Sequence, residues 1–173
     1  MIDFTAASGS RLIKKVAMDG SKLAEGSKKR AGLRVSLAGY RLEDQVGFVI
    51  RKATQRHTAI FMKQMTDGLT PTQWAAVVKV AELGAVSQNQ LGRDTAMDVA
   101  TIKGVVDRLV KRGFVTASSD PADSRRNLIA LTPEGADFVK IGRPVAAGIT
   151  EETLHGLSPD ERRTLIELLR KIA

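Results

Sequence analysis

Apolar side chains recur along most of this chain at the three- and four-residue spacing of amphipathic helices. The longest such stretch covers about residues 41–66, where apolar side chains run from Leu42 to Phe61 on one side of the predicted helix. Asp67 and Gly68 then interrupt the pattern, as turn-forming residues commonly do after a helix. The pattern therefore predicts a long first helix with one apolar face.

Three shorter helices are predicted next, and the residues at their ends mark them most clearly. Each follows a Thr, Ser or Asp whose side chain can accept hydrogen bonds from the free N–H groups of the first helical turn. In the first two, a Gln three residues later completes a capping box. Glycine closes the first and the third. The three helices span 71–84, 87–95 and 99–112, and their capping residues are Thr70, Ser87 and Asp98.

A β-hairpin is predicted after these helices. Residues 114–118 and 128–131 are short runs rich in β-branched and apolar residues. Between them lies a turn-rich stretch, 119–126, which contains Asp, Pro and Ser and ends on two arginines. The expected structure is two short strands joined by a long, basic tip, and the alternative is that this tip is only a solvated loop.

Two helices are predicted to complete the chain. Thr132 and Pro133 begin the first, and Pro144 is expected to kink it because proline removes one backbone donor. Ser158 opens a capping box at the start of the last helix, whose apolar side carries leucines and isoleucines as far as Ile172. The predicted fold class is therefore mainly α with a small β-hairpin.

Charge separates the first forty residues from the rest of the chain. The net charge is +8, and residues 1–40 hold eight Lys or Arg against three Asp or Glu. Their apolar residues are sparse and lack helical spacing, which predicts a basic, flexible arm before a domain at 41–173. A basic balance favours an anionic partner such as nucleic acid, a membrane surface or an acidic ligand, although a solvated basic surface fits the charge equally well.

The chain lacks the residues that several other function classes need. It has no cysteine and two histidines, so disulfides and thiolate metal sites are excluded, and neither a metal nor a cofactor is predicted. It also has no Gly-rich phosphate loop, His-Glu zinc motif, or Ser or Cys nucleophile paired with a base, which argues against an enzyme. No run approaches about 20 apolar residues, so no membrane partner is expected. The start of the chain lacks the apolar core of a secretory signal, and the expected location is the cytoplasm.

The predicted helices 87–95 and 99–112 have the lengths and the tight joint of a helix-turn-helix. In such a unit the N-terminal half of the second helix enters the major groove of double-stranded DNA. Its outward positions carry small or polar residues, which would allow close approach to base edges, and the alternative is an ordinary amphipathic helix. The candidate DNA contacts are Asp98, Ala100, Thr101, Lys103, Gly104 and Arg108.

These stretches resemble the MarR (multiple antibiotic resistance regulator) family of winged helix-turn-helix proteins. The sequence DSRRNLIALT at 123–132 is similar to the family's wing signature. Residues 101–115 resemble its recognition helix and the path from that helix into the wing, and 132–135 resemble the start of its dimerisation helices. The resemblance covers about residues 41–173, in which these motifs follow one another in the family's order.

The resemblance implies a winged helix-turn-helix lobe at 70–132 and a helical dimerisation region at 41–66 and 133–173. A homodimer is therefore expected. The wing would place one arginine in the narrow minor groove, where negative potential is concentrated, with an aspartate to steady it and a second arginine near a phosphate. The minor-groove arginine would be Arg125, the aspartate Asp123 and the arginine near a phosphate Arg126.

The resemblance also implies a small anionic, commonly aromatic, effector that binds between the dimerisation helices and the DNA-binding lobe. The sequence of residues 46–57 resembles that of family members that regulate aromatic-acid catabolism. Some of those members sense the free acid, and others sense its coenzyme A thioester. An arginine would pair with the carboxylate, and an aromatic side chain would pack on the effector ring. The candidate ligand residues are Phe48, Arg51, Arg56, His57, Trp74 and Arg143, with Lys28, Lys29 and Arg30 of the arm for the phosphates of a thioester.

Other interpretations of the same residues stay open at this point. His57 and Trp74 also fit core or interface positions, and Arg51 and Arg56 also fit a solvated surface or contacts with phosphate. At the level of function, the alternative is an architectural nucleic-acid-binding protein that needs no effector. Competition between a specific operator and bulk DNA would distinguish that class from a regulator.

Overall fold

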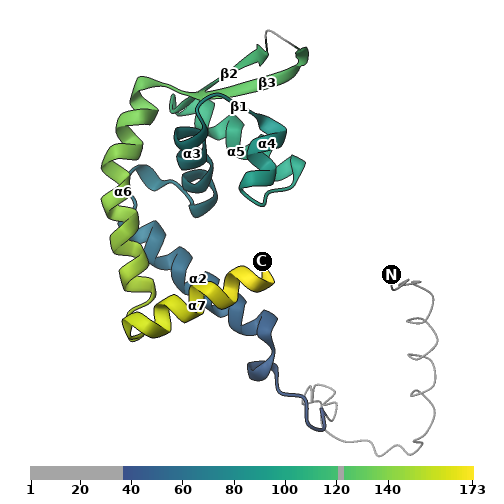
Figure 1. Cartoon of the computed structure of the whole chain (residues 1–173), viewed down its shortest axis with the longest axis vertical. Helices are drawn as coiled ribbons and strands as arrows, with labels where there is room; N and C mark the ends of the chain where they lie inside the picture. Colours follow the sequence, from purple (N-terminus) through teal and green to yellow (C-terminus); the bar gives the residue numbers. More distant parts are fainter. Residues whose placement is uncertain (1–36, 121–122) are drawn as a thin grey trace, which may run out of the picture. The chain divides into compact units, whose positions relative to one another are not determined.

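The computed structural model describes residues 37–120 and 123–173 (Figure 1). The chain divides into two units, Met1–Tyr40 and Arg41–Ala173. Three candidate ligand residues of the predicted basic arm lie outside the described residues, namely Lys28, Lys29 and Arg30.

The described part of the second unit is mainly helical. Its six α-helices are α2 (Val46–Gln64), α3 (Pro71–Leu83), α4 (Gln88–Asp94), α5 (Val99–Lys111), α6 (Pro133–Thr153) and α7 (Pro159–Ile172). Its three strands are β1 (Val86–Ser87), β2 (Val115–Asp120) and β3 (Asp123–Leu131). Two 3-10 turns flank α2, at Leu42–Asp44 and Thr66–Gly68. Helices with one small antiparallel sheet confirm the predicted fold class.

The predicted capping residues begin the helices of the lobe as expected. Thr70 and Gln73 form a reciprocal capping box, in which the Thr70 hydroxyl accepts from the Gln73 backbone N–H and Gln73 Oε1 accepts from the Thr70 N–H. Ser87, Asp98 and Ser158 accept from a backbone N–H in the same way at the starts of α4, α5 and α7. The capping box predicted at Ser87 is only half formed, because the Gln90 side chain bonds to Asp94 and Arg93 and not to the Ser87 backbone. Local capping therefore fixes where these helices begin.

Two helices differ from the prediction. The first begins at Val46 and not near residue 41, because residues 42–44 form a separate 3-10 turn and Gln45 is extended and makes no side-chain cap. α6 runs as one helix through Pro144, where the sequence predicts a kink. The proline removes one donor from a helix of 21 residues that also packs against α2, so the remaining bonds and contacts suffice to continue it.

The three strands form one antiparallel sheet in the order β1, β3, β2. The hairpin of β2 and β3 is longer than predicted, because pairing continues outward from Val115 and Leu131 as far as Asp120 and Asp123. Residues 123–126, which the sequence predicts in a loop tip, therefore belong to β3. Polar residues in an exposed two-stranded ribbon need no apolar alternation, so composition alone does not distinguish them from a loop.

The core lies in the lobe formed by α3, α4, α5 and the sheet. α6 begins against this lobe and then extends to α2, against which it packs (Figure 1). α7 buries none of its residues. The most deeply buried side chains of the lobe include Leu69, Leu91, Ile102, Leu109 and Ile129.

The described residues contain neither a membrane span nor a metal cluster. No helix within 37–120 and 123–173 is both long enough and apolar enough to cross a bilayer. In the same residues, no three His, Cys, Asp or Glu side chains gather where they could hold a metal ion.

Candidate nucleic-acid interface and effector site

α4 and α5 pack closely against each other at the joint of the helix-turn-helix. A Cβ atom on Gly92 of α4 would lie 3.2 Å from Ile102 Cγ2 of α5 and 3.2 Å from the Met97 carbonyl oxygen. α4 ends at Asp94, and the hydroxyl of Thr95, its C-cap, donates to the Leu91 carbonyl 2.6 Å away. A side chain at the Gly92 position would therefore require its neighbours to shift by a few tenths of an ångström, and sequence patterning alone does not show how close the two helices are.

α5 has one buried and one exposed side. Its four core side chains are at most 3% exposed, as the sequence predicts for Ile102, Val105, Val106 and Leu109. The candidate DNA contacts lie outside this buried set: Gly104 is half-buried, and the exposed ones are Asp98, Ala100, Thr101, Lys103 and Arg108. Their exposure leaves them available to a partner, and their contact with DNA stays a prediction.

The polar side chains at the start of α5 hold one another. Asp98 Oδ1 accepts from the Thr101 backbone N–H at 2.7 Å, and Asp98 Oδ2 accepts from the Thr101 hydroxyl at 3.0 Å. These two bonds, the backbone one above all, hold the pKa of Asp98 below its usual range. Asp98 is therefore the N-cap of α5, which is a structural role.

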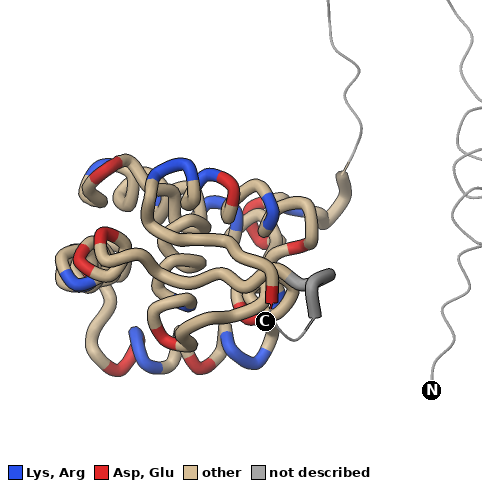
Figure 2. Tube along the Cα trace, turned by 90° about the horizontal axis from the view of Figure 1, so that it is seen from above, with Lys and Arg blue, Asp and Glu red and all other residues tan. Residues whose placement is uncertain are grey.

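The predicted wing contacts lie on β3, which contains Asp123, Arg125 and Arg126. The placement of these three side chains is outside the described part. Basic and acidic positions are interspersed along the described trace (Figure 2). Residues 41–173 carry 19 Lys or Arg and 16 Asp or Glu, so most of the basic excess belongs to residues 1–40. The part that the wing arginines play stays a prediction.

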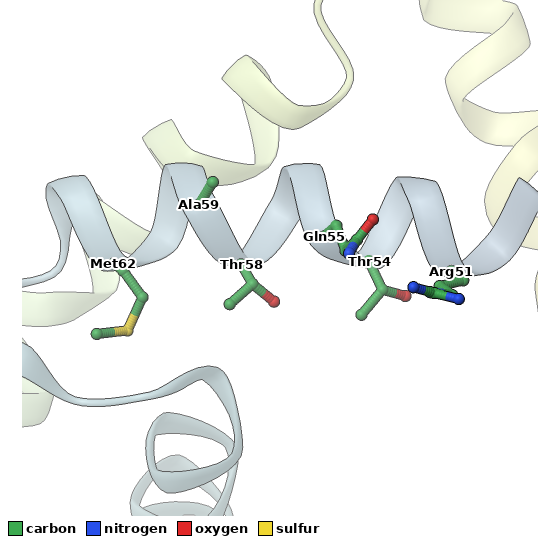
Figure 3. Close-up of a pocket in the computed structure, with 6 residues that line it drawn as sticks. All are labelled: Arg51, Thr54, Gln55, Thr58, Ala59 and Met62. Carbon is green, nitrogen blue, oxygen red and sulfur yellow. The ribbon is translucent and has the colours of Figure 1, made fainter. Parts of the chain in front are cut away.

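A hollow of about 570 Å³ lies along one side of α2 (Figure 3). Thr54, Thr58 and Met62 project from the same side of the helix, with the Arg51 guanidinium at one end of the row. The surface thus combines a cation, hydroxyl groups and apolar atoms, which suits a small molecule with a charged end and an apolar body. The lining residues are Arg51, Thr54, Gln55, Thr58, Ala59 and Met62.

Arg51 is a candidate ligand residue from the sequence, and the other lining residues are not. A sequence signal for them exists, because residues three, four, seven and eleven positions after Arg51 fall on one side of a helix. Those positions are Thr54, Gln55, Thr58 and Met62. Helical spacing counted from the arginine would have grouped them.

Arg56 and His57 face α6 and not the hollow. An Arg56 N–H donates to the Glu152 carbonyl at 3.4 Å. His57 Nδ1 lies 3.1 Å from Thr153 Oγ1, and the Thr153 hydroxyl itself donates to the Ile149 carbonyl at 2.8 Å. Because that hydroxyl has a single proton, His57 Nδ1 is the donor in its bond with Thr153. These contacts tie α2 to α6 within the chain and fit the alternative in which His57 is a packing residue and not a ligand residue.

The remaining candidate ligand residues are spread over the domain. The Trp74 ring lies edge-on to Phe138, with ring centroids 5.9 Å apart. Phe48 is half-buried near the start of α2, and Arg143 is exposed on α6. The structure therefore places Arg51 in the hollow and does not bring these other candidates into its lining.

A helix-turn-helix followed by a β-hairpin defines the class of winged helix-turn-helix proteins. The model of the MarR family matches residues 69–126. The chain is 41% identical over 134 residues to the HTH-type transcriptional repressor NicR of Pseudomonas putida, covering 77% of this chain and 85% of that protein. The chain belongs to the MarR family of DNA-binding transcriptional regulators.

The solved structures that are similar to this one include two bacterial regulators. A probable transcriptional regulator from Pseudomonas aeruginosa is 50% identical, with a TM-score of 0.75 and coverage of 77% of this chain and 100% of that one. Bordetella bronchiseptica BpsR, whose DNA binding is regulated by 6-hydroxynicotinic acid, is 42% identical, with a TM-score of 0.70 and coverage of 75% and 98%. Both agree with the family and the fold that the sequence predicts.

Proposed function

We propose that the protein is a homodimeric repressor that binds a pseudo-palindromic operator in double-stranded DNA and is released by a small aromatic carboxylic acid. One observation carries the proposal: the same domain holds a winged helix-turn-helix and, on α2, a hollow lined by an arginine. BpsR supports an aromatic acid as the class of effector, because 6-hydroxynicotinic acid regulates its DNA binding.

In this proposal, the start of α5 lies in the major groove and the hairpin contacts the adjacent backbone and minor groove. Two basic side chains of α5 are held by exposed local partners. Lys103 Nζ pairs with Asp107 at 2.9 Å, and an Arg108 N–H donates to the Gly104 carbonyl at 3.4 Å. Exposed pairs of this kind contribute little stability, so both cations can exchange these partners for DNA phosphates.

α2 and α7 are proposed to form the dimer interface. The exposed large apolar side chains of these two helices are between 38% and 67% exposed, and apolar patches of this kind usually mark interfaces. We expect light scattering at micromolar concentration to give twice the 18.7 kDa chain mass, and a stable monomer would contradict the proposal. The side chains concerned are Val46, Val49, Ile50, Ile166, Leu168, Leu169 and Ile172.

The hollow fits a free acid better than a coenzyme A thioester. A guanidinium such as that of Arg51 binds a carboxylate through two parallel hydrogen bonds. A thioester carries several phosphate charges, and the hollow offers one cation to meet them. The alternative effector would therefore need cations from elsewhere, and the candidates are Lys28, Lys29 and Arg30.

Release of operator DNA tests the proposal. An operator is first selected from random duplexes with the full-length protein, and 6-hydroxynicotinate, benzoate and matching thioesters are then titrated. We expect the free acids to release the DNA. Arg51→Gln should raise the concentration for half-release about tenfold, because it removes a charge-assisted hydrogen bond, and should leave operator affinity unchanged.

Two other variants serve as controls in the same assay. Lys63→Gln removes an exposed cation of α2 that does not line the hollow, and it should behave as the wild type. Arg125→Ala should weaken operator binding with or without effector, because it acts on the wing. If no acid and no thioester releases the DNA, an aromatic effector is refuted. If thioesters alone release it, the effector's phosphates are expected to contact the basic arm.

A further inference from the structure

Val99 presents an exposed apolar side chain at the leading end of the helix proposed to contact DNA. It is the first residue of α5 and is 72% exposed, the highest value among the exposed large apolar side chains of the described part. Ile102, three residues later, is 1% exposed. Single exposed apolar residues are common on protein surfaces, so the position of Val99, more than its exposure, is informative.

The polar groups of this first turn are already engaged. Both carboxylate oxygens of Asp98 accept from Thr101, at 2.7 Å from its backbone N–H and at 3.0 Å from its hydroxyl. The Thr101 hydroxyl therefore has no second proton to donate to a base edge. Ala100 adds an exposed methyl group. While the bond from the Thr101 hydroxyl to Asp98 is kept, the leading turn of α5 offers a partner the methyl groups of Val99 and Ala100 and the acceptor oxygen of Thr101.

Methyl groups have one specific partner in the major groove. Thymine carries a C5-methyl group there, and apolar side chains discriminate thymine by contacting it. We propose that Val99 is a specificity-determining residue that contacts the methyl group of one thymine in each half-site. This inference rests on the proposed operator binding and deepens it by naming the base that the first turn of α5 selects.

Val110 provides a matched control on the same helix. It is also an exposed valine, at 40%, and it lies at nearly the same angle around α5 but roughly three turns further on. That distance places it away from the helix end that enters the groove. Alanine favours helices more than valine does, so Val99→Ala and Val110→Ala should both fold normally.

In vitro selection from a random duplex library, with the full-length protein and each variant, gives the first test. We expect the wild type and Val110→Ala to enrich thymine at one position of each half-site. Val99→Ala should lose that preference and keep the others. The proposal would be overturned if Val99→Ala selected the same thymines as the wild type. It would also be overturned if Val99→Ala bound all sequences more weakly by the same factor.

Deoxyuridine in place of that thymine gives the second test, because it removes the methyl group and leaves base pairing unchanged. The wild type and Val110→Ala should lose about fourfold in affinity per half-site, the effect of exposing one buried methyl group. Val99→Ala should lose almost nothing, and equal losses in all three proteins would overturn the proposal. The test also separates two failures: a selected site that ignores Val99 leaves operator binding intact, whereas no selected site for the wild type rejects operator binding itself.

Discussion

We expect Gly135→Ala to lower the free energy of unfolding by about 3 kcal/mol or more, at the upper end for overpacking a buried position. Gly135 lies buried in the first turn of α6. A Cβ atom there would overlap the carbonyl oxygen of Phe114, and it would lie 2.9 Å from the carbonyl carbon and 3.2 Å from Leu131 Cδ2. The carbonyl cannot simply move away, because it accepts from the Thr132 backbone N–H at 3.1 Å.

Urea unfolding followed by circular dichroism measures this effect, with Gly148→Ala as the matched control. Gly148 lies in the same helix. Apart from its chain neighbours and the nearby backbone of α6, no heavy atom would lie within 4 Å of a Cβ atom added there. Gly148→Ala should therefore be neutral or stabilising by about 0.5–1 kcal/mol, because alanine favours helices. Equal unfolding midpoints for the two variants would show that α6 is not anchored against the root of the hairpin in this way.

The helix starts of the lobe could be predicted because capping is local. Thr70, Ser87 and Asp98 each act on backbone groups within three residues, so the sequence contains all the information needed. The extent of the hairpin could not be predicted, because strand pairing depends on a partner and polar ribbon residues resemble loop residues. β1, with two residues, is too short to show alternation.

Close contacts of glycine are the least predictable feature of the fold. Gly113 has a φ of 75° at the end of α5, and the sequence predicts this role because helix ends commonly use a left-handed glycine. Gly92, Gly135 and Gly142 instead allow an approach to a residue on another element. The residues that Gly135 and Gly142 approach most closely, Phe114 and Trp74, are distant in the sequence. No local pattern therefore reveals which glycines permit such contacts.

The proposed effector site could be predicted in part from the sequence. An arginine on the first helix is a reasonable partner for a carboxylate, and Arg51 lines the hollow. Arg56 and His57 were equally reasonable from composition, yet they face α6. Because each residue advances about 100° around a helix, neighbouring basic residues point to different sides, and only the packing of α6 on α2 decides which side is covered.

Gly142 lets α6 approach the ring of Trp74 more closely than a side chain would permit. A Cβ atom at Gly142 would lie 2.5 and 2.6 Å from Trp74 Cζ3 and Cη2. The ring contacts Phe138, which stacks on Phe114 with centroids 4.5 Å apart. The Arg112 guanidinium, at the end of α5, lies 5.2 Å from the centroid of Phe114. A displaced indole would therefore disturb a row of contacts that runs from α6 to the end of α5.

We expect Gly142→Ala to shift the tryptophan emission, to lower the free energy of unfolding by about 1–3 kcal/mol and to weaken operator binding. Trp74 is the chain's single tryptophan, so the emission reports this ring directly. Operator binding should fall because α6 packs against the lobe, and in the proposed dimer the spacing of the two recognition helices must match the half-sites. Gly148→Ala, measured in the same three ways, should stay close to the wild type. Wild-type emission in Gly142→Ala would contradict the close contact between Gly142 and Trp74. Changed emission with unchanged operator affinity would show that the row of aromatic contacts contributes to packing and not to DNA binding.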